Sequence, residues 1–410
     1  MHLAASNPAK AIHKNELANV HVLRYVHGIV NSPTSMNRKP ISSAELVKAL
    51  EARLRGLLGQ VTWLRGWSIR NFPSDLDHGF DLLVTLSLPH SRPVDLWVQC
   101  KAEPRPSQFP YSQVVSKVPP EPVLVFAAPI ISPRMAEVCR ESGWSWFDLA
   151  GNCRIEVPGL LQLQHTGRAP VHQTPKPIAN LSTPEAGRII RALLLPENVR
   201  QRWTQRLLAE HFGKLEHPLR EPSLGLVNKV IRHLREEAFI EQAPDGGFRL
   251  REPQKLLFVW RDAYRFDRHE RRSCFTMLQG NKLRAALYRF GLHASLAAYA
   301  SFSAADFQAP HVRQPKTWLY VRRQDFSALE ERAELKTVDS GENAVVLIPD
   351  DEGVFYRCDG GSTGDHRMSC TNAVQTYVDL WHSGGRSQEA AEALLEQRLK
   401  PEWKAKGLTV

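Results

Sequence analysis

Apolar positions in the first part of the chain recur with helical spacing in some segments and with strand spacing in others. A helix is predicted from Ser42, a suitable cap, to Gly59, because leucines recur every three or four residues: Leu46, Leu50, Leu54 and Leu57. Strand-like runs follow at 66–71, 80–88, 94–100, 123–127 and 144–147, with a helix at 133–142 and a final hairpin at 153–157 and 160–165. These elements predict a mixed α/β domain over residues 41–168.

The middle of the chain has a different pattern, in which helices come first and a hairpin follows. Thr183-Pro184-Glu185 starts a helix, because Pro is favoured in a first turn. A second helix covers 205–212. Ser223 caps a third helix, whose apolar stripe consists of Leu224, Val227, Ile231 and Leu234. A strand from 239, a Gly-rich turn at 243–247 and a return strand at 248–250 complete the order, which predicts a winged helix within residues 183–272.

The remaining segments complete the predicted plan of the chain. Residues 1–40 are polar and form a flexible arm, and a Pro-, His- and Thr-rich linker covers 169–182. Residues 273–410 alternate between helices at 282–290, 326–332, 372–380 and 387–407 and strands at 317–321, 344–348 and 354–357. The predicted fold class is therefore α+β, with an N-terminal α/β domain, a central winged helix and a mixed α/β C-terminal domain.

The charge distribution bears on the partner of this protein. The formal charge is +10, and between Arg188 and Arg272 there are 18 basic and 12 acidic residues. Such a balance attracts polyanions, chiefly nucleic acid, although an ordinary solvated surface could have the same composition. No apolar run is long enough to cross a bilayer, no secretion signal is evident, and the six cysteines include no CxxC pair. We expect a cytoplasmic protein with no membrane partner.

The third helix of the predicted winged helix carries polar and basic residues opposite its apolar stripe. A helix with such a face fits the major groove of double-stranded DNA, and basic residues on the hairpin can reach phosphates. The predicted DNA-binding residues are Asn228, Lys229, Arg232 and Arg235 on the helix and Arg249 and Arg251 on the hairpin. The alternative is a winged helix that contacts only proteins. The turn at 213–222 is longer than usual before a recognition helix.

Three residues of the first domain form a candidate catalytic group. Asp81 opens one strand, and Gln99 and Lys101 end the next, so all three can meet at one edge of the sheet. Asp81 could hold Mg²⁺ and Lys101 could activate water for phosphodiester attack. The pattern resembles the PD-(D/E)xK nuclease fold, in the Mrr-like variant where Gln replaces the second acid; the domain is then restriction-endonuclease-like. Two alternatives remain, a nuclease-like fold that does not cut, and an unrelated domain in which Asp81 caps a strand and Lys101 is solvated.

Several short segments together resemble one bacterial family. These segments are 147–152 (Phe-Asp-Leu-Ala-Gly-Asn), 260–264 (Trp-Arg-Asp-Ala-Tyr), 374–380 (Val-Gln-Thr-Tyr-Val-Asp-Leu) and 389–392 (Glu-Ala-Ala-Glu). They resemble AbiEi-type proteins, antitoxins and transcriptional regulators of type IV toxin–antitoxin systems. The resemblance implies promoter binding by a winged helix, an antitoxin role for the C-terminal domain and a nucleotidyltransferase-type toxin as partner. In that family the winged helix is usually N-terminal, whereas here a further domain precedes it.

Three functions follow from these patterns. The first is a DNA-binding transcriptional regulator, which needs no cofactor to bind DNA. The second is an enzyme, a Mg²⁺-dependent DNA nuclease targeted by its winged helix. The third is an antitoxin that neutralises a partner through its C-terminal domain. Binding of plasmid DNA without cleavage in the presence of Mg²⁺ would favour the first over the second.

Overall fold

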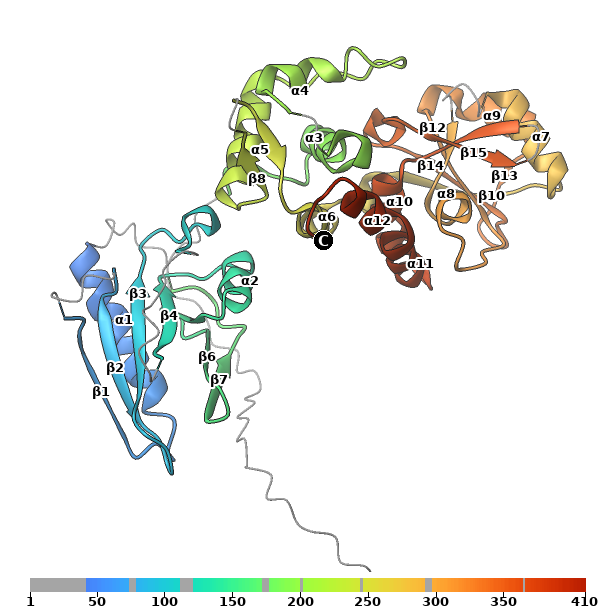
Figure 1. Cartoon of the computed structure of the whole chain (residues 1–410). Helices are drawn as coiled ribbons and strands as arrows, with labels where there is room; N and C mark the ends of the chain where they lie inside the picture. The colour runs from blue at the N-terminus through green and yellow to red at the C-terminus, as the bar shows by residue number, and fades with distance from the viewer. Residues whose placement is uncertain are drawn as a thin grey trace, which may run out of the picture. The chain divides into compact units, whose positions relative to one another are not determined.

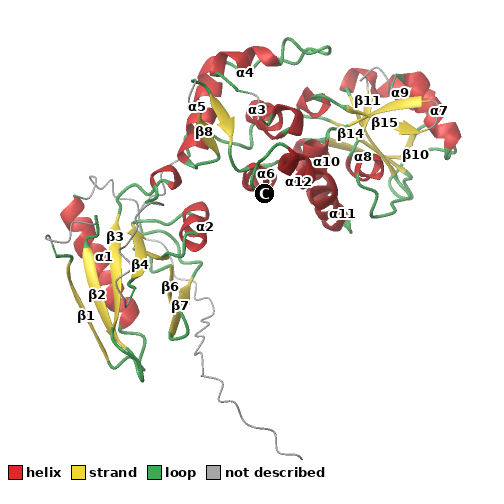
Figure 2. Ribbon diagram, in the orientation of Figure 1, coloured by secondary structure: helices red, strands yellow, loops and turns green. Residues whose placement is uncertain are grey.

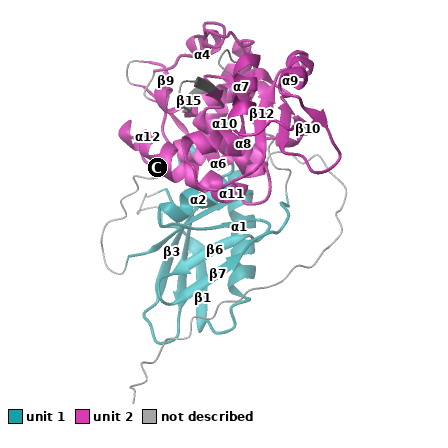
Figure 3. Ribbon diagram, turned by 90° about the vertical axis from the view of Figure 1, so that its right-hand side faces the viewer, with its two compact units in different colours: residues 1–175 teal, residues 176–410 magenta. Residues whose placement is uncertain are grey.

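The computed structural model describes residues 42–73, 79–110, 121–171, 177–199, 202–243, 246–291, 297–363 and 366–410. The chain divides into two compact units of mixed α/β structure, residues 1–175 and 176–410 (Figure 3). The predicted arm at 1–40 lies outside the described residues. No described helix is both long and apolar enough to cross a membrane.

The first unit is built on one seven-stranded sheet whose strands follow chain order (Figure 1). Neighbouring strands are antiparallel except for the parallel pairs β3–β4 and β4–β5. Its elements are α1 (Ser43–Leu58), β1 (Gly66–Asn71), β2 (Leu82–Ser87), β3 (Val94–Cys100), a 3₁₀ turn (Pro106–Gln108), β4 (Val123–Ala128), α2 (Pro133–Glu141), β5 (Ser145–Asp148), β6 (Cys153–Val157) and β7 (Leu161–His165).

Helices cover both faces of this sheet. Ser42 and Glu45 form a reciprocal capping box at the start of α1, which fixes where the helix begins. The leucines of α1 pack on one face of the sheet, against residues such as Val84 and Val98. On the other face, α2 packs against an aromatic cluster that includes Phe126. The predicted helix over the leucine repeat is confirmed.

The second unit begins with three helices and a two-stranded hairpin (Figure 2). The elements are α3 (Pro184–Leu194), a 3₁₀ turn (Pro196–Asn198), α4 (Gln205–His211), α5 (Leu224–Glu236), β8 (Ile240–Gln242), β9 (Phe248–Leu250) and α6 (Pro253–Ala263). Trp203, before α4, adds a third backbone segment to the hairpin: its N–H donates to the Phe248 carbonyl (3.0 Å), and the Phe248 N–H donates to the Trp203 carbonyl (2.8 Å).

The rest of the second unit forms another seven-stranded sheet, in the order β13-β10-β14-β12-β11-β16-β15. The strands are β10 (Glu270–Phe275), β11 (Ala297–Tyr299), β12 (Thr317–Val321), β13 (Lys336–Thr337), β14 (Ala344–Ile348), β15 (Asp359–Thr363) and β16 (His366–Cys370). The helices are α7 (Asn281–Phe290), α8 (Ser301–Gln308), α9 (Phe326–Arg332), α10 (Ala373–His382), α11 (Ser387–Leu394) and α12 (Lys400–Ala405), with 3₁₀ turns at Phe266–Arg268, Arg323–Asp325 and Glu352–Phe355 and a π-helical turn at Leu395–Leu399.

One hydrophobic core joins the three-helix segment to this sheet. It contains apolar residues of α3, α5 and α6 together with residues of β12, β14, α10 and α11. Helix α3 is central to it, because every residue from Ala186 to Leu194 is buried. The region expected to be a winged helix and the C-terminal region therefore fold into one compact unit.

The strand expected at 354–357 is wrong. The structure has a 3₁₀ turn at Glu352–Phe355, in which Val354 and Phe355 are buried in the shared core. Asp351 caps this turn by accepting a hydrogen bond from the Gly353 N–H (2.9 Å). Local β-branched and aromatic residues suggested a strand, but the cap and the tertiary packing decide the conformation.

Candidate nucleic-acid interface

Helix α5 has one buried face and one exposed, basic face. Ser223 caps the helix, as predicted, by accepting a hydrogen bond from the Leu226 N–H (3.2 Å). Val227, Val230, Ile231 and Leu234 are buried. The four residues predicted to contact DNA are all exposed: Asn228, Lys229, Arg232 and Arg235. The helical period thus separates the core-facing residues from a polar surface.

The cations of α5 differ from many others in the chain because they are not neutralised internally. Within the described part of the chain, no carboxylate forms an ion pair with Lys229, Arg232 or Arg235. On neighbouring α4, by contrast, Glu210 pairs with Lys214 (2.7 Å) and lies 3.9 Å from Arg206. The positive charge of α5 is therefore available to an external anion.

The hairpin carries the two other predicted DNA contacts. Arg249 is exposed on β9, and its Nε lies 2.6 Å from Glu241 Oε1 on β8. This cross-strand pair partly neutralises Arg249. Arg251 is exposed just after β9, and its N–H donates to the Phe239 carbonyl (2.8 Å). The loop between α4 and α5 is long, as the sequence indicated, and the Leu219 N–H joins it to the Phe212 carbonyl (2.9 Å).

The three candidate catalytic residues of the first unit lie around the end of β3. Asp81 precedes β2, and its Oδ2 accepts a hydrogen bond from the Cys100 N–H (2.7 Å). Gln99 is buried and donates to the Gly79 carbonyl (2.9 Å). Lys101 is exposed. Burial raises the pKa of the Cys100 thiol, the charge of Asp81 raises it further, and Lys101 acts to lower it, so both charges lie near this thiol.

Few oxygen ligands for a divalent cation lie around Asp81 and the end of β3. Mg²⁺ prefers several oxygen ligands, and carboxylates above all. Asp81 Oδ2 is engaged with the backbone of β3, and the amide of Gln99 points to the Gly79 carbonyl. Among the described residues, no group of three or more His, Cys, Asp or Glu could hold a metal ion. These contacts agree with the alternative in which Asp81 caps a strand, here the end of β3.

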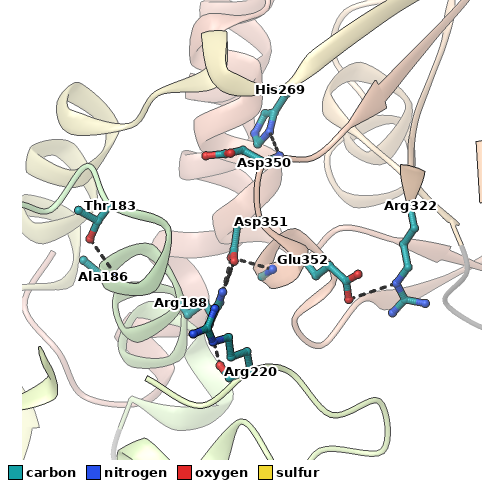
Figure 4. Close-up of polar contacts among 10 residues, drawn as sticks. Thr183, Ala186, Arg188, Arg220, His269, Arg322, Asp350, Asp351 and Glu352 are labelled. Carbon is teal, nitrogen blue, oxygen red and sulfur yellow. Dashed lines mark hydrogen bonds and ion pairs between the residues drawn. The ribbon is translucent and has the colours of Figure 1, made fainter. Parts of the chain in front are cut away.

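A buried polar network ties α3 to the C-terminal sheet (Figure 4). Arg188 contacts both carboxylate oxygens of Asp351 and also donates to the Arg220 carbonyl (2.7 Å) in the loop before α5. One turn further along α3, Nε of Arg191 donates to Gln375 Oε1 on α10. Both arginines are buried.

The centre of this network is a fully buried carboxyl on α10. Asp379 Oδ1 accepts hydrogen bonds from Gln375 Nε2 (2.7 Å), the Tyr320 hydroxyl (3.0 Å) and the Tyr264 hydroxyl (3.4 Å). Burial raises the pKa of Asp379 to about 7, although these donors and the charge of Arg191 act to lower it. The Tyr264 hydroxyl also contacts His269 Nε2 (2.7 Å). Burial lowers the pKa of His269 to about 4, helped by Arg191.

Comparison with known proteins finds one family model that matches part of the chain. Residues 249–400 match the family model described as "Transcriptional regulator, AbiEi antitoxin, Type IV TA system". The match starts in β9 and includes the segments 260–264, 374–380 and 389–392 that carry the resemblance; the segment 147–152 lies outside it. No curated protein and no solved structure matches the chain.

Sequence reasoning missed the network around Arg191 and Asp379. The available signal was the presence of Arg188 and Arg191 within an otherwise apolar helix, because a charge on a buried face requires a partner. Asp379, Gln375 and Tyr264 lie within the matched residues, and the network explains why the polar residues Gln375 and Asp379 lie on the buried helix α10.

Proposed function

We propose that this protein is a DNA-binding transcriptional regulator whose residues from α3 to β9 form a winged helix. The observation that carries the proposal is the exposed face of α5, whose cations have no internal ion-pair partner in the described chain. The backbone pairing of Trp203 with Phe248 supports it further, since this isolated bridge holds the segment before α4 against the hairpin that would be the wing. The match to a family of transcriptional regulators agrees with this function.

The proposed mode of binding follows from charge and shape. Helix α5 enters the major groove, where Asn228 contacts base edges and Lys229, Arg232 and Arg235 contact phosphates. Arg249 and Arg251 on the hairpin contact phosphates of the flanking backbone. Each phosphate contact releases condensed counterions, which makes the affinity depend strongly on salt.

Fluorescence anisotropy in EDTA tests this proposal. A labelled duplex from the region upstream of the protein's own gene is compared with a scrambled duplex of the same composition. We expect tighter binding to the upstream duplex and weaker binding to both as the salt concentration rises. Absence of binding to both duplexes at low salt would contradict the proposal.

We propose in addition that the protein is the antitoxin of a type IV toxin–antitoxin pair. The support is the family match, which covers the sheet and helices from β10 to α11. The partner is a toxin of the nucleotidyltransferase type, and the site of action is the C-terminal part of the second unit. Growth of cells that express the toxin of the same operon tests this role. We expect co-expression of the antitoxin to restore growth, and the same arrest with and without it would contradict the role.

A further inference from the structure

A small pocket lies beside the first two turns of α3, at the junction with α6 and the sheet. Trp260, Tyr264 and Gly187 are among its lining residues. The remaining lining residues are Leu181, Ser182, Thr183, Pro184, Arg191, Arg265, Arg268, His269, Asp350 and Asp351. Its volume is about 30 Å³, so it takes part of a small ligand while the rest of that ligand remains in solvent.

Arg191 lines this pocket, and one of its donors is unsatisfied. Its side chain is 3% exposed, and its Nη1 has no hydrogen-bond acceptor in the described structure. The guanidinium stacks over the Trp260 ring, 5.2 Å from the ring centroid, which holds it in place. A buried donor without a partner costs free energy, and an anionic ligand would remove that cost.

The other charged groups around the pocket leave a net attraction for an anion. Asp351 pairs with Arg188, and Asp267 pairs with Arg265 (2.7 Å). Burial raises the pKa of Asp379, a carboxyl that contacts Tyr264 and interacts with the charge of Arg191, to about 7, which reduces its negative charge near neutral pH. The guanidinium of Arg268 donates to the Ser182 carbonyl (3.1 Å) and forms no ion pair in the described chain. Among the lining residues, Asp350 is then the one acid without a basic partner, and it is exposed.

The start of α3 adds to this attraction. Thr183 caps the helix by accepting a hydrogen bond from the Ala186 N–H (3.4 Å), and both residues appear in Figure 4. The positive end of the helix dipole therefore faces the pocket from Thr183 and Pro184. Helix N-termini with nearby cations are common sites for phosphate and sulfate.

We propose that this pocket binds a small oxyanion with the chemistry of inorganic phosphate or sulfate, held by Arg191 and Arg268 at the start of α3. The anion accepts hydrogen bonds from the buried Nη1 of Arg191 and from the guanidinium of Arg268. The site is distinct from the exposed face of α5. Because Arg188 on the same helix contacts the Arg220 carbonyl, the bound anion stabilises the helix that supports the loop before α5.

Isothermal titration calorimetry of the full chain with inorganic phosphate tests this site. Sulfate and acetate are titrated in parallel, and chloride at the same ionic strength is the control for screening. We expect saturable binding of phosphate and sulfate, and weaker binding of acetate, which has fewer oxygens to engage both arginines.

Three variants locate the binding. In Gly187→Ala the new methyl lies 3.3 Å from Arg191 Nη1 and 3.6 Å from the Trp260 ring, so it fills the pocket and we expect no binding. Arg268→Gln changes an exposed residue, and we expect about tenfold weaker binding. Arg289→Gln removes another exposed cation, on α7, and should leave binding unchanged.

The exposed face of α5 can also attract phosphate, so the titration is repeated with Arg232→Ala/Arg235→Ala, which should bind phosphate as the unmodified protein does. Loss of binding in that variant, an unchanged affinity in Arg268→Gln, or a response that chloride reproduces would overturn the proposal. If Gly187→Ala fails to fold, the phosphate affinity of Arg268→Gln alone decides whether the pocket binds the anion. Failure of this site would leave the DNA-binding proposal untouched.

Discussion

Arg188 on α3 forms a buried ion pair with the carboxylate of Asp351, which lies 163 residues further along the chain. Nε of Arg188 is 3.0 Å from each carboxylate oxygen, and the two side chains are 8% and 10% exposed. Burial acts to raise the pKa of Asp351, but the hydrogen bonds and charge of Arg188, with the charge of Arg191, hold it below its ordinary value. The pair joins the proposed DNA-binding module to the matched C-terminal region.

Removing one partner of this pair should destabilise the second unit. Asp351→Ala leaves Arg188 buried without its counter-ion, and we expect the free energy of unfolding to fall by about 3 kcal/mol or more. Arg188→Met/Asp351→Leu, which removes both charges, should cost less. Urea denaturation followed by circular dichroism measures both. A double variant less stable than Asp351→Ala would contradict this account of the pair.

The pH dependence of stability should change when Asp379 is replaced. Its pKa is raised by burial to about 7 in the folded protein, against an ordinary value of 3.8. The folded state therefore binds more protons than the unfolded state between these values, and Asp379 lowers stability as the pH rises from about 4 to 7. Asp379→Asn cannot ionise, so its stability relative to the unmodified protein should increase over that range, by up to about 3 kcal/mol.

His269 has the opposite effect on the pH dependence of stability. Its folded pKa of about 4 lies below the ordinary 6.5, so its contribution is present above pH 6.5 and is lost as the pH falls toward 4. In the unmodified protein the two effects offset each other in that range. Denaturation of Asp379→Asn at several pH values between about 4.5 and 7.5 should reveal the loss of stability that His269 causes at acid pH. A difference in stability that does not vary with pH would show that Asp379 is ionised in the folded state throughout.

Asp81 should be needed for the stability of the first unit. Its carboxylate accepts the Cys100 N–H at the end of β3, so Asp81→Ala leaves that donor unpaired and should cost about 1–3 kcal/mol. Lys101→Ala, at an exposed position, should be close to neutral. Incubation of both variants with plasmid and Mg²⁺ tests the catalytic alternative. Cleavage by the unmodified protein that both substitutions abolish would assign these residues to a nuclease site instead.

The Glu241–Arg249 pair on the hairpin should restrain DNA binding. Glu241→Gln frees the Arg249 guanidinium and removes a negative charge near the proposed phosphate contacts. We expect roughly a severalfold gain in affinity at low salt and a steeper dependence on salt. Glu396→Gln, which removes another carboxylate that forms a surface ion pair, far along the chain, is the control. Equal DNA affinities for both variants would show that the hairpin does not contact DNA.

Much of the first sheet could be predicted because its signals are local. The strands at Gly66–Asn71, Val94–Cys100 and Cys153–Val157 begin and end where the alternation of apolar residues places them, and Ser42 marks the start of α1. The cap at Ser223 and most of the stripe of α5 are local in the same sense, but Leu224 of the predicted stripe is wrong, because it is exposed in the first turn. These elements follow from residues within a few positions of one another.

The second unit was less predictable because its decisive contacts span long sequence separations. Strand β11, at Ala297–Tyr299, is short and receives its partners from β12 and β16. The turn at Glu352–Phe355 depends on Asp351 and therefore on Arg188. The helix expected at 387–407 is divided by a π-helical turn at Leu395–Leu399. No local pattern carries this information, since it arises from packing around α3.

The central claim is that the exposed face of α5 binds DNA. Anisotropy titrations between about 50 and 200 mM salt compare the unmodified protein with Arg232→Ala/Arg235→Ala and with Lys282→Ala/Arg289→Ala, a matched loss of two exposed cations on α7. We predict that the α5 variant binds about tenfold or more weakly at moderate salt, with a salt dependence shallower by about two counterions. The α7 variant should bind as the unmodified protein does. A folded α5 variant with unchanged affinity and salt dependence would contradict the claim.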